Sequence, residues 1–228
     1  MVTNFTEFLV SEALTKHKGL NRFRWDMTMA GPWNFNDTRK YRNGPMVPPG
    51  LYKAVLVYGD KTMSQDFELV MDPRVVESGV SETDVKAQVD FQMAVRDKLS
   101  EAYLFEQALE KEVESLNSKP RLTESEESRL KTLEGVLSQV QTEEGIYMQP
   151  MIADQWRYLY SMMNQADQVP GGDARQRFSE LEAELQRLKS EAALKEEEGW
   201  GQLENLQRDW PLPMTNAVFG KLRLPASE

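Results

Sequence analysis

The chain has 228 residues, with 27 basic and 37 acidic side chains, so its formal net charge is −10. This excess of negative charge argues against a protein that binds a nucleic-acid backbone or an anionic membrane surface. The absence of cysteine excludes thiol catalysis, disulfides and thiolate metal sites, and a single histidine argues against a histidine-built metal centre. No run of about twenty apolar residues is present, and the N-terminus does not resemble a signal peptide, so the sequence predicts neither membrane insertion nor an export signal.

Residues before about position 75 hold most of the glycines and prolines, together with aromatic and β-branched runs. Residues 21–26 alternate, with Phe23 and Trp25 on one face, which predicts a half-buried strand. Glycine and proline recur through residues 30–50, and this composition predicts a long irregular loop.

Two further alternating segments, 51–58 and 62–71, flank the turn signal Gly59-Asp60 and predict a β-hairpin. Proline at position 73 ends the second strand, because proline cannot donate to a strand ladder. Three strands are few for a sandwich, which normally has about seven. We therefore predict that residues 1–75 form a small immunoglobulin- or fibronectin-like β-sandwich, in which either the first eighteen residues contribute further structure or an open edge is covered from outside the chain.

Residues 76–210 are rich in Glu, Leu, Gln and Lys at helical spacing. Capping sequences at Ser81 and Thr123, a proline at position 150 and a capping Asp173 mark four helix starts. Short connections between amphipathic helices predict an antiparallel four-helix bundle. Residues 211–228 contain three prolines and predict an extended tail. The fold class is therefore α+β, with the two parts segregated along the chain.

No phosphate-binding loop, zinc-protease motif, nucleophile elbow or calcium loop is present. Two acidic clusters, Glu124 to Glu127 and Glu196 to Glu198, are interpreted as solvated helix faces, because carboxylate metal bundles usually add histidines. The sequence therefore predicts no catalytic residue, no metal and no cofactor.

Aromatic residues in the loop provide the main candidate contacts. Trp33, Phe35 and Tyr41 could form a stacking platform for a sugar or for a partner's side chain. The alternative is that they fold back over an open sheet face. In the tail, Val218, Phe219 and Leu222 are candidate partner contacts.

Several motifs occur in a recognisable order: Gly19-Leu-Asn-Arg-Phe-Arg-Trp-Asp26, Gly44-Pro45, Pro48-Pro-Gly-Leu-Tyr52 and Asp72-Pro-Arg74. In this order the chain resembles the C-terminal portion of large bacterial exported proteins with sortilin-like β-propellers, often labelled glycosyl-hydrolase or neuraminidase-repeat proteins. The resemblance covers roughly residues 19–210 and implies a small sandwich followed by helices. The propeller is absent from this chain, and no position matches a catalytic motif, so the resemblance implies an accessory role in the periplasm or outside the cell.

The leading hypothesis is a non-enzymatic accessory module that docks on other protein subunits, such as those of a membrane-anchored complex, and completes its sheet with a partner's strand. The second is a carbohydrate-binding module detached from a propeller glycosidase, with Trp33, Phe35 and Tyr41 as its platform. A hydrolase is the third hypothesis and would need a carboxylate pair that the sequence does not reveal.

Overall fold

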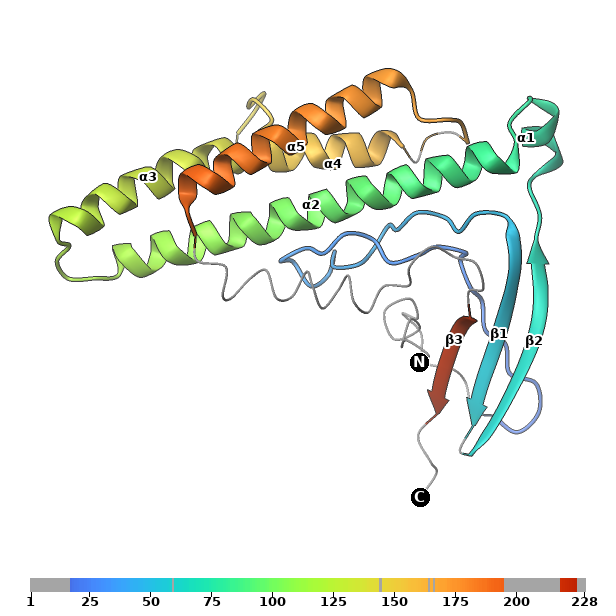
Figure 1. The fold of residues 1–228 in the computed structure, drawn as a ribbon. Helices are drawn as coiled ribbons and strands as arrows, with labels where there is room; N and C mark the ends of the chain where they lie inside the picture. The colour runs from blue at the N-terminus through green and yellow to red at the C-terminus, as the bar shows by residue number, and fades with distance from the viewer. Residues whose placement is uncertain are drawn as a thin grey trace.

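A long helical body and a sheet that projects from one of its ends make up the molecule (Figure 1). The computed structural model describes residues 17–58, 60–143, 145–163, 165, 167–194 and 218–224. The elements are β1 (Gly50–Tyr58), β2 (Lys61–Leu69), α1 (Pro73–Glu77), α2 (Glu82–Asn117), α3 (Glu124–Val140), α4 (Ile152–Met162), α5 (Gly172–Ala192) and β3 (Val218–Leu224).

Helix α2 is the 36-residue axis of the helical body. Its start is fixed by a capping box, because the Ser81 hydroxyl accepts from the Asp84 backbone N–H and the Asp84 carboxylate accepts from the Ser81 backbone N–H. At about 1.5 Å per residue, the helix is about 54 Å long. Its apolar stripe is buried against the other helices, and the core of the helical body includes Val95, Leu99, Phe105 and Leu109.

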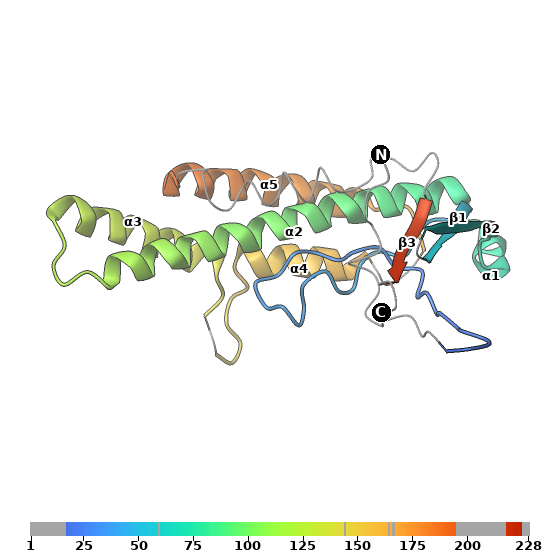
Figure 2. The ribbon, with the colours of Figure 1, turned by 90° about the horizontal axis from the view of Figure 1, so that it is seen from below.

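The other three long helices form two rows beside α2, whereas a four-helix bundle would place them in three. Helices α3 and α4, of 17 and 11 residues, follow one another along α2, and α5 packs beside both of them (Figures 1 and 2). The predicted four-helix bundle is therefore wrong, because α3 ends at Val140 and each of the two helices is too short to match α2 alone. The capping box at Thr123 is confirmed, whereas α5 is capped by Gly171 and not by Asp173.

The sheet has the order β2-β1-β3. Strands β1 and β2 form the predicted hairpin, with Tyr52 opposite Phe67 and Tyr58 opposite Lys61. Strand β3 runs parallel to β1 on its other side, with a register irregularity between Ala54 and Val55. The described residues form no second sheet, so the predicted immunoglobulin- or fibronectin-like β-sandwich is wrong.

Residues 21–26 form no strand, which corrects a second prediction. This segment lies across the sheet without pairing to it, and the Trp25 ring meets both Tyr52 and Phe67 edge-on, with 6.2 Å between ring centroids in each pair. The alternation of Phe23 and Trp25 therefore reflects one aromatic side chain that packs on a sheet, not a ladder of backbone hydrogen bonds.

Residues 27–47 form an irregular loop, which overlaps most of the loop that the sequence predicted over residues 30–50. The loop doubles back on itself, with the Met29 N–H bonded to the Pro45 carbonyl and the Gly31 N–H bonded to the Tyr41 carbonyl, both at 2.8 Å. Glycine is required at Gly31 and Gly44, because a Cβ at either position would lie within 2 Å of a backbone carbonyl oxygen of the opposite arm. Arg96, almost fully buried in α2, holds the loop against the helical body by donating to the Ala30 carbonyl.

The short helix α1 joins the hairpin to α2 and was not predicted. Asp72 caps it by accepting from the Arg74 backbone N–H, and Pro73 occupies its first turn. None of the described helices combines the length and apolarity that crossing a bilayer would require.

Candidate functional site

The outer edge of β2, nine residues long, pairs with no other strand that the structure describes. The Asp66 carbonyl accepts from the side chain of its neighbour Gln65, so it points away from β1. Because backbone direction alternates along a strand, the N–H and C=O groups of Ser64 and Glu68 point the same way. No backbone group that the structure describes pairs with this edge.

Apolar side chains on the hairpin remain largely open to solvent. Leu51 is 79 % exposed and Met63 is 55 % exposed, and Leu56, opposite Met63, is also exposed. Only the end of the hairpin near the helical body is packed, where Tyr52 is buried against Phe67 and Trp25. The hairpin is thus packed at the end near the helical body, whereas Leu51, Leu56 and Met63 stay exposed and β3 pairs with the other edge of β1.

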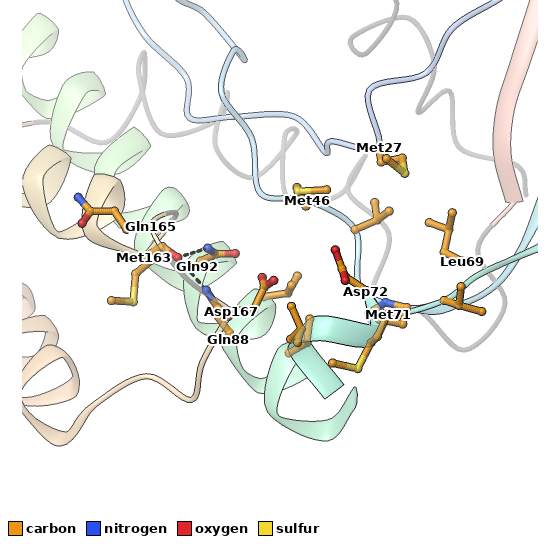
Figure 3. A pocket seen from close by; sticks show the side chains of 16 residues that line it. Met27, Met46, Leu69, Met71, Asp72, Gln88, Gln92, Met163, Gln165 and Asp167 are labelled. Carbon is orange, nitrogen blue, oxygen red and sulfur yellow. Dashed lines mark hydrogen bonds between the residues drawn. The ribbon is translucent and has the colours of Figure 1, made fainter. Parts of the chain in front are cut away.

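A pocket of about 570 Å³ lies between the helical body and the end of the hairpin nearest to it, which we call the foot of the hairpin (Figure 3). We call it the junction pocket; its volume falls within the roughly 300–1,000 Å³ typical of ligand sites. Four segments build it: the loop, the end of β2 with α1, the first turns of α2, and the connection after α4. Its lining residues are Met27, Met46, Val47, Pro49, Leu69, Val70, Met71, Asp72, Val75, Val85, Gln88, Val89, Gln92, Met163, Gln165 and Asp167.

Two buried glutamines fix one wall of the junction pocket. The Nε2 groups of Gln88 and Gln92 both donate to the Met163 carbonyl, at 2.8 and 2.6 Å (Figure 3). The Gln88 Oε1 atom in turn accepts from the Gln168 backbone N–H at 2.9 Å. These bonds tie the connection after α4 to α2, so this wall is rigid where the methionine side chains opposite are adaptable.

The junction pocket is acidic. Its lining contains two carboxylates, Asp72 and Asp167, and no lysine or arginine. Hydrogen bonds from Arg74 lower the pKa of Asp72 to about 2, so Asp72 stays ionised but is already paired. Asp167 is exposed and forms no ion pair with any residue that the structure describes. The pocket therefore suits an apolar group with a positive charge next to it.

Glu106 is a buried carboxyl group elsewhere, in the middle of α2. Burial raises its pKa to about 7, and neighbouring Glu110 adds to the rise. Such a shift is a feature of catalytic acids, but it also occurs in structural clusters. Glu106 does not line the junction pocket, and no group of three or more potential metal-binding side chains occurs among the described residues.

The predicted aromatic platform does not lie on the surface as a unit. Trp33 is only 4 % exposed and belongs to the core of the helical body, where its backbone N–H donates to the Ser100 hydroxyl. Tyr41 is half-buried against the same core, whereas Phe35 is half-exposed and meets Tyr103 edge-on. The loop aromatics thus fold onto α2 and not over a sheet face, and the Trp33 ring offers no open face to a sugar.

The predicted tail contacts lie in β3. The backbone of Val218 is opposite Lys53, that of Phe219 opposite Ala54, and that of Leu222 opposite Leu56. The tail therefore contributes to the sheet itself at this point.

Sequence reasoning missed the junction pocket. One signal was available: Gln88 and Gln92 are four residues apart on the same helix face as Val85 and Val89, so two amides interrupt an apolar stripe. The methionines Met27, Met46 and Met71 gave no signal, because they come from segments brought together only by the fold.

Comparisons of the chain with protein-family models, with curated proteins and with solved structures found no match. The resemblance to the sortilin-like propeller proteins stays a prediction from the order of its motifs. The outer edge of β2 and the junction pocket are the two candidate contact surfaces among the described residues.

Proposed function

We propose that this protein is a non-enzymatic accessory module that joins a larger protein assembly by pairing the outer edge of β2 with an extended segment of a partner. The observation that carries this proposal is the nine-residue edge whose outward N–H and C=O groups bond to no other described strand. An added strand satisfies such groups and gains affinity from backbone hydrogen bonds, while its side chains provide specificity.

The surroundings of the edge support the same function. The foot of the hairpin is packed on Trp25, so the edge has a defined orientation relative to the helical body. Exposed Met63 offers apolar area on β2 beside an incoming strand, and exposed Leu51 does so one strand further in, on the opposite face of the sheet. Asp66 already pairs with Lys53 across the hairpin, and the exposed Glu68 on the same face of β2 favours a basic side chain on the partner strand.

The cellular setting of this proposal rests on the family resemblance alone. The resemblance implies a protein that acts in the periplasm or outside the cell, and we propose a subunit of a complex there, such as a membrane-anchored one, as the partner. The net charge of −10 is consistent with a basic contact surface on that partner.

Proline substitution at the edge tests this function directly. Ser64→Pro removes an outward N–H and leaves the β1–β2 bonds intact, as edge strands tolerate proline. Ser64→Thr is the matched control, because it keeps the N–H. Each tagged full chain is expressed in its source organism, cross-linked, and recovered from membrane and periplasmic fractions for quantitative mass spectrometry.

We expect one stoichiometric partner with the wild type and with Ser64→Thr, and its loss with Ser64→Pro. Amide hydrogen exchange on the recovered complex should show new protection at Ser64 and Glu68. Circular dichroism confirms that each variant is folded. Equal recovery of the partner by both variants, or recovery of the wild type as a lone monomer, would contradict the proposal.

A further inference from the structure

We propose that the junction pocket binds an aromatic or long aliphatic side chain of the partner, with a lysine or arginine next to it in the partner's sequence. This inference rests on the proposed function and specifies its recognition chemistry. The occupant is a basic segment of the partner protein, and a second copy of this chain or a small apolar molecule is an alternative outcome of the test.

The position of the pocket connects it with the proposed strand-binding edge. Leu69 is the last residue of β2, and Val70 and Met71, which follow it, also line the pocket. A partner segment that pairs with β2 therefore ends beside the pocket. Figure 3 shows Leu69 and Met71 on one side of the space and Met27 and Met46 on another.

The lining selects an apolar anchor of adjustable shape. Methionine side chains from the loop and from the end of β2 are unbranched and polarizable, and such surfaces adapt to different aromatic and aliphatic groups. Met46 is 57 % exposed although it faces an apolar wall that includes Val85 and Val89. An inserted side chain would cover this apolar area, which solvent now reaches.

The charged residues of the lining favour a basic residue next to the inserted side chain in the partner's sequence. Asp167 is exposed and lacks a described ionic partner, and Arg74 already pairs with Asp72, so Asp167 provides the uncompensated negative charge. A lysine or arginine beside the anchor reaches a carboxylate without being buried. An acidic neighbour would meet two carboxylates and no cation among the lining residues.

Selection from a random library of displayed peptides of about twelve residues, long enough to pair along one strand, tests this specificity. The full chain and its Asp167→Lys variant are used as parallel targets. Peptides selected on the wild type should combine an aromatic or long aliphatic residue with a lysine or arginine within two positions. Asp167→Lys should reduce the enrichment of that basic residue about tenfold.

Binding of the most enriched synthetic peptide is then measured by fluorescence anisotropy. Met46→Glu introduces a charge into the pocket and should weaken binding at least about tenfold. Met148→Glu is the matched control, because Met148 is also partly exposed but lies in the α3–α4 connection, outside the pocket lining. It should bind like the wild type.

The outcomes separate the two proposals. Peptides that are lost with Ser64→Pro but are insensitive to Met46→Glu and Asp167→Lys overturn the pocket inference and leave the proposed function standing. Loss with Met46→Glu alone supports the pocket and contradicts strand pairing. Failure to enrich any peptide, or enrichment of acidic ones, overturns the pocket inference. Concentration-dependent dimers that Met46→Glu disrupts, measured by sedimentation, would identify a second copy as the occupant and overturn it as well.

Discussion

The helical body and the hairpin differ in how they use their apolar residues. In the helical body, large side chains such as Leu99, Phe105 and Trp156 are almost completely buried between α2, the row of α3 and α4, and α5. In the hairpin, Leu51 and Met63 are mainly exposed, and only the foot has a core of its own. Among the described residues, the helical body therefore has a large buried core, whereas the sheet has an unpaired edge and exposed apolar side chains.

This contrast indicates that the two regions contribute differently to stability and to the exposed surface. Burial of apolar area stabilises the helical body at roughly 25 cal/mol per Å², so that region provides most of the free energy of folding. The hairpin gains little by burial of Leu51 and Met63, and it is stabilised instead by the aromatic cluster at one end and by the pairing of β1 with β3. Its attachment at Trp25, Tyr52 and Phe67 lets it be presented to a partner as an ordered element.

The largest effect is expected in the core of the helical body. Trp156 is fully buried and meets Phe178 edge-on at 5.2 Å, so Trp156→Ala should lower the free energy of unfolding by about 3–5 kcal/mol. Trp156→Phe should cost less, because it also removes an indole N–H that donates to no described acceptor. Urea denaturation measures both. Equal losses for the two variants would show that the ring's volume is not the cause.

A buried carboxyl gives the next largest effect, and it depends on pH. The pKa of Glu106 is raised to about 7 in the folded chain, against about 4.3 in an unfolded one. The wild type therefore loses stability as pH rises between these values, because only the unfolded chain ionises freely. Glu106→Gln should be more stable than the wild type by about 1–3 kcal/mol at pH 8 and equally stable at pH 4.

The exposed Glu114 on the same helix is the control for this measurement, since Glu114→Gln should change stability little at either pH. Urea denaturation of the three proteins at several pH values measures the difference. A stability difference between Glu106→Gln and the wild type that is independent of pH would contradict the raised pKa.

Removal of the cap of α2 should have a smaller effect. Ser81→Ala eliminates the hydroxyl that accepts from the Asp84 N–H and should cost about 1 kcal/mol. Ser81→Asp keeps an N-cap acceptor and should restore most of the loss. Thermal denaturation followed by circular dichroism at 222 nm measures both variants; equal melting temperatures for Ser81→Ala and the wild type would show that the cap does not stabilise α2.

The smallest effect is expected on the hairpin. Leu51→Thr places a β-branched polar residue at an exposed strand position, so stability should change by less than about 0.5 kcal/mol. The same substitution at the buried Leu99 should cost at least about 3 kcal/mol. A large loss from Leu51→Thr in the isolated chain would mean that the sheet face is covered within the chain, and the contrast between the two regions would not hold.

Local sequence signals were sufficient for the starts of α2 and α3 and for the hairpin. The capping boxes at Ser81 and Thr123 are confirmed, because each depends on bonds between residues three positions apart. The hairpin is confirmed because the pattern of alternation and the turn signal are both local.

By itself, the sequence determined the charge, the lack of thiol chemistry, the position of α2 and the two antiparallel strands. The sequence led to the wrong architecture for two reasons. The alternating pattern around Trp25 cannot show whether this residue lies in a hydrogen-bonded strand or only packs on a sheet. The helix pattern cannot show that α3 and α4 follow one another along the same side of α2. Tertiary structure alone decided that Trp33 is buried, that Leu51 is exposed, and that Met46, Met71 and Asp167 surround one pocket. The physical reason is that capping and alternation act between neighbours in the chain, whereas burial and pocket formation depend on contacts between segments that are distant in sequence.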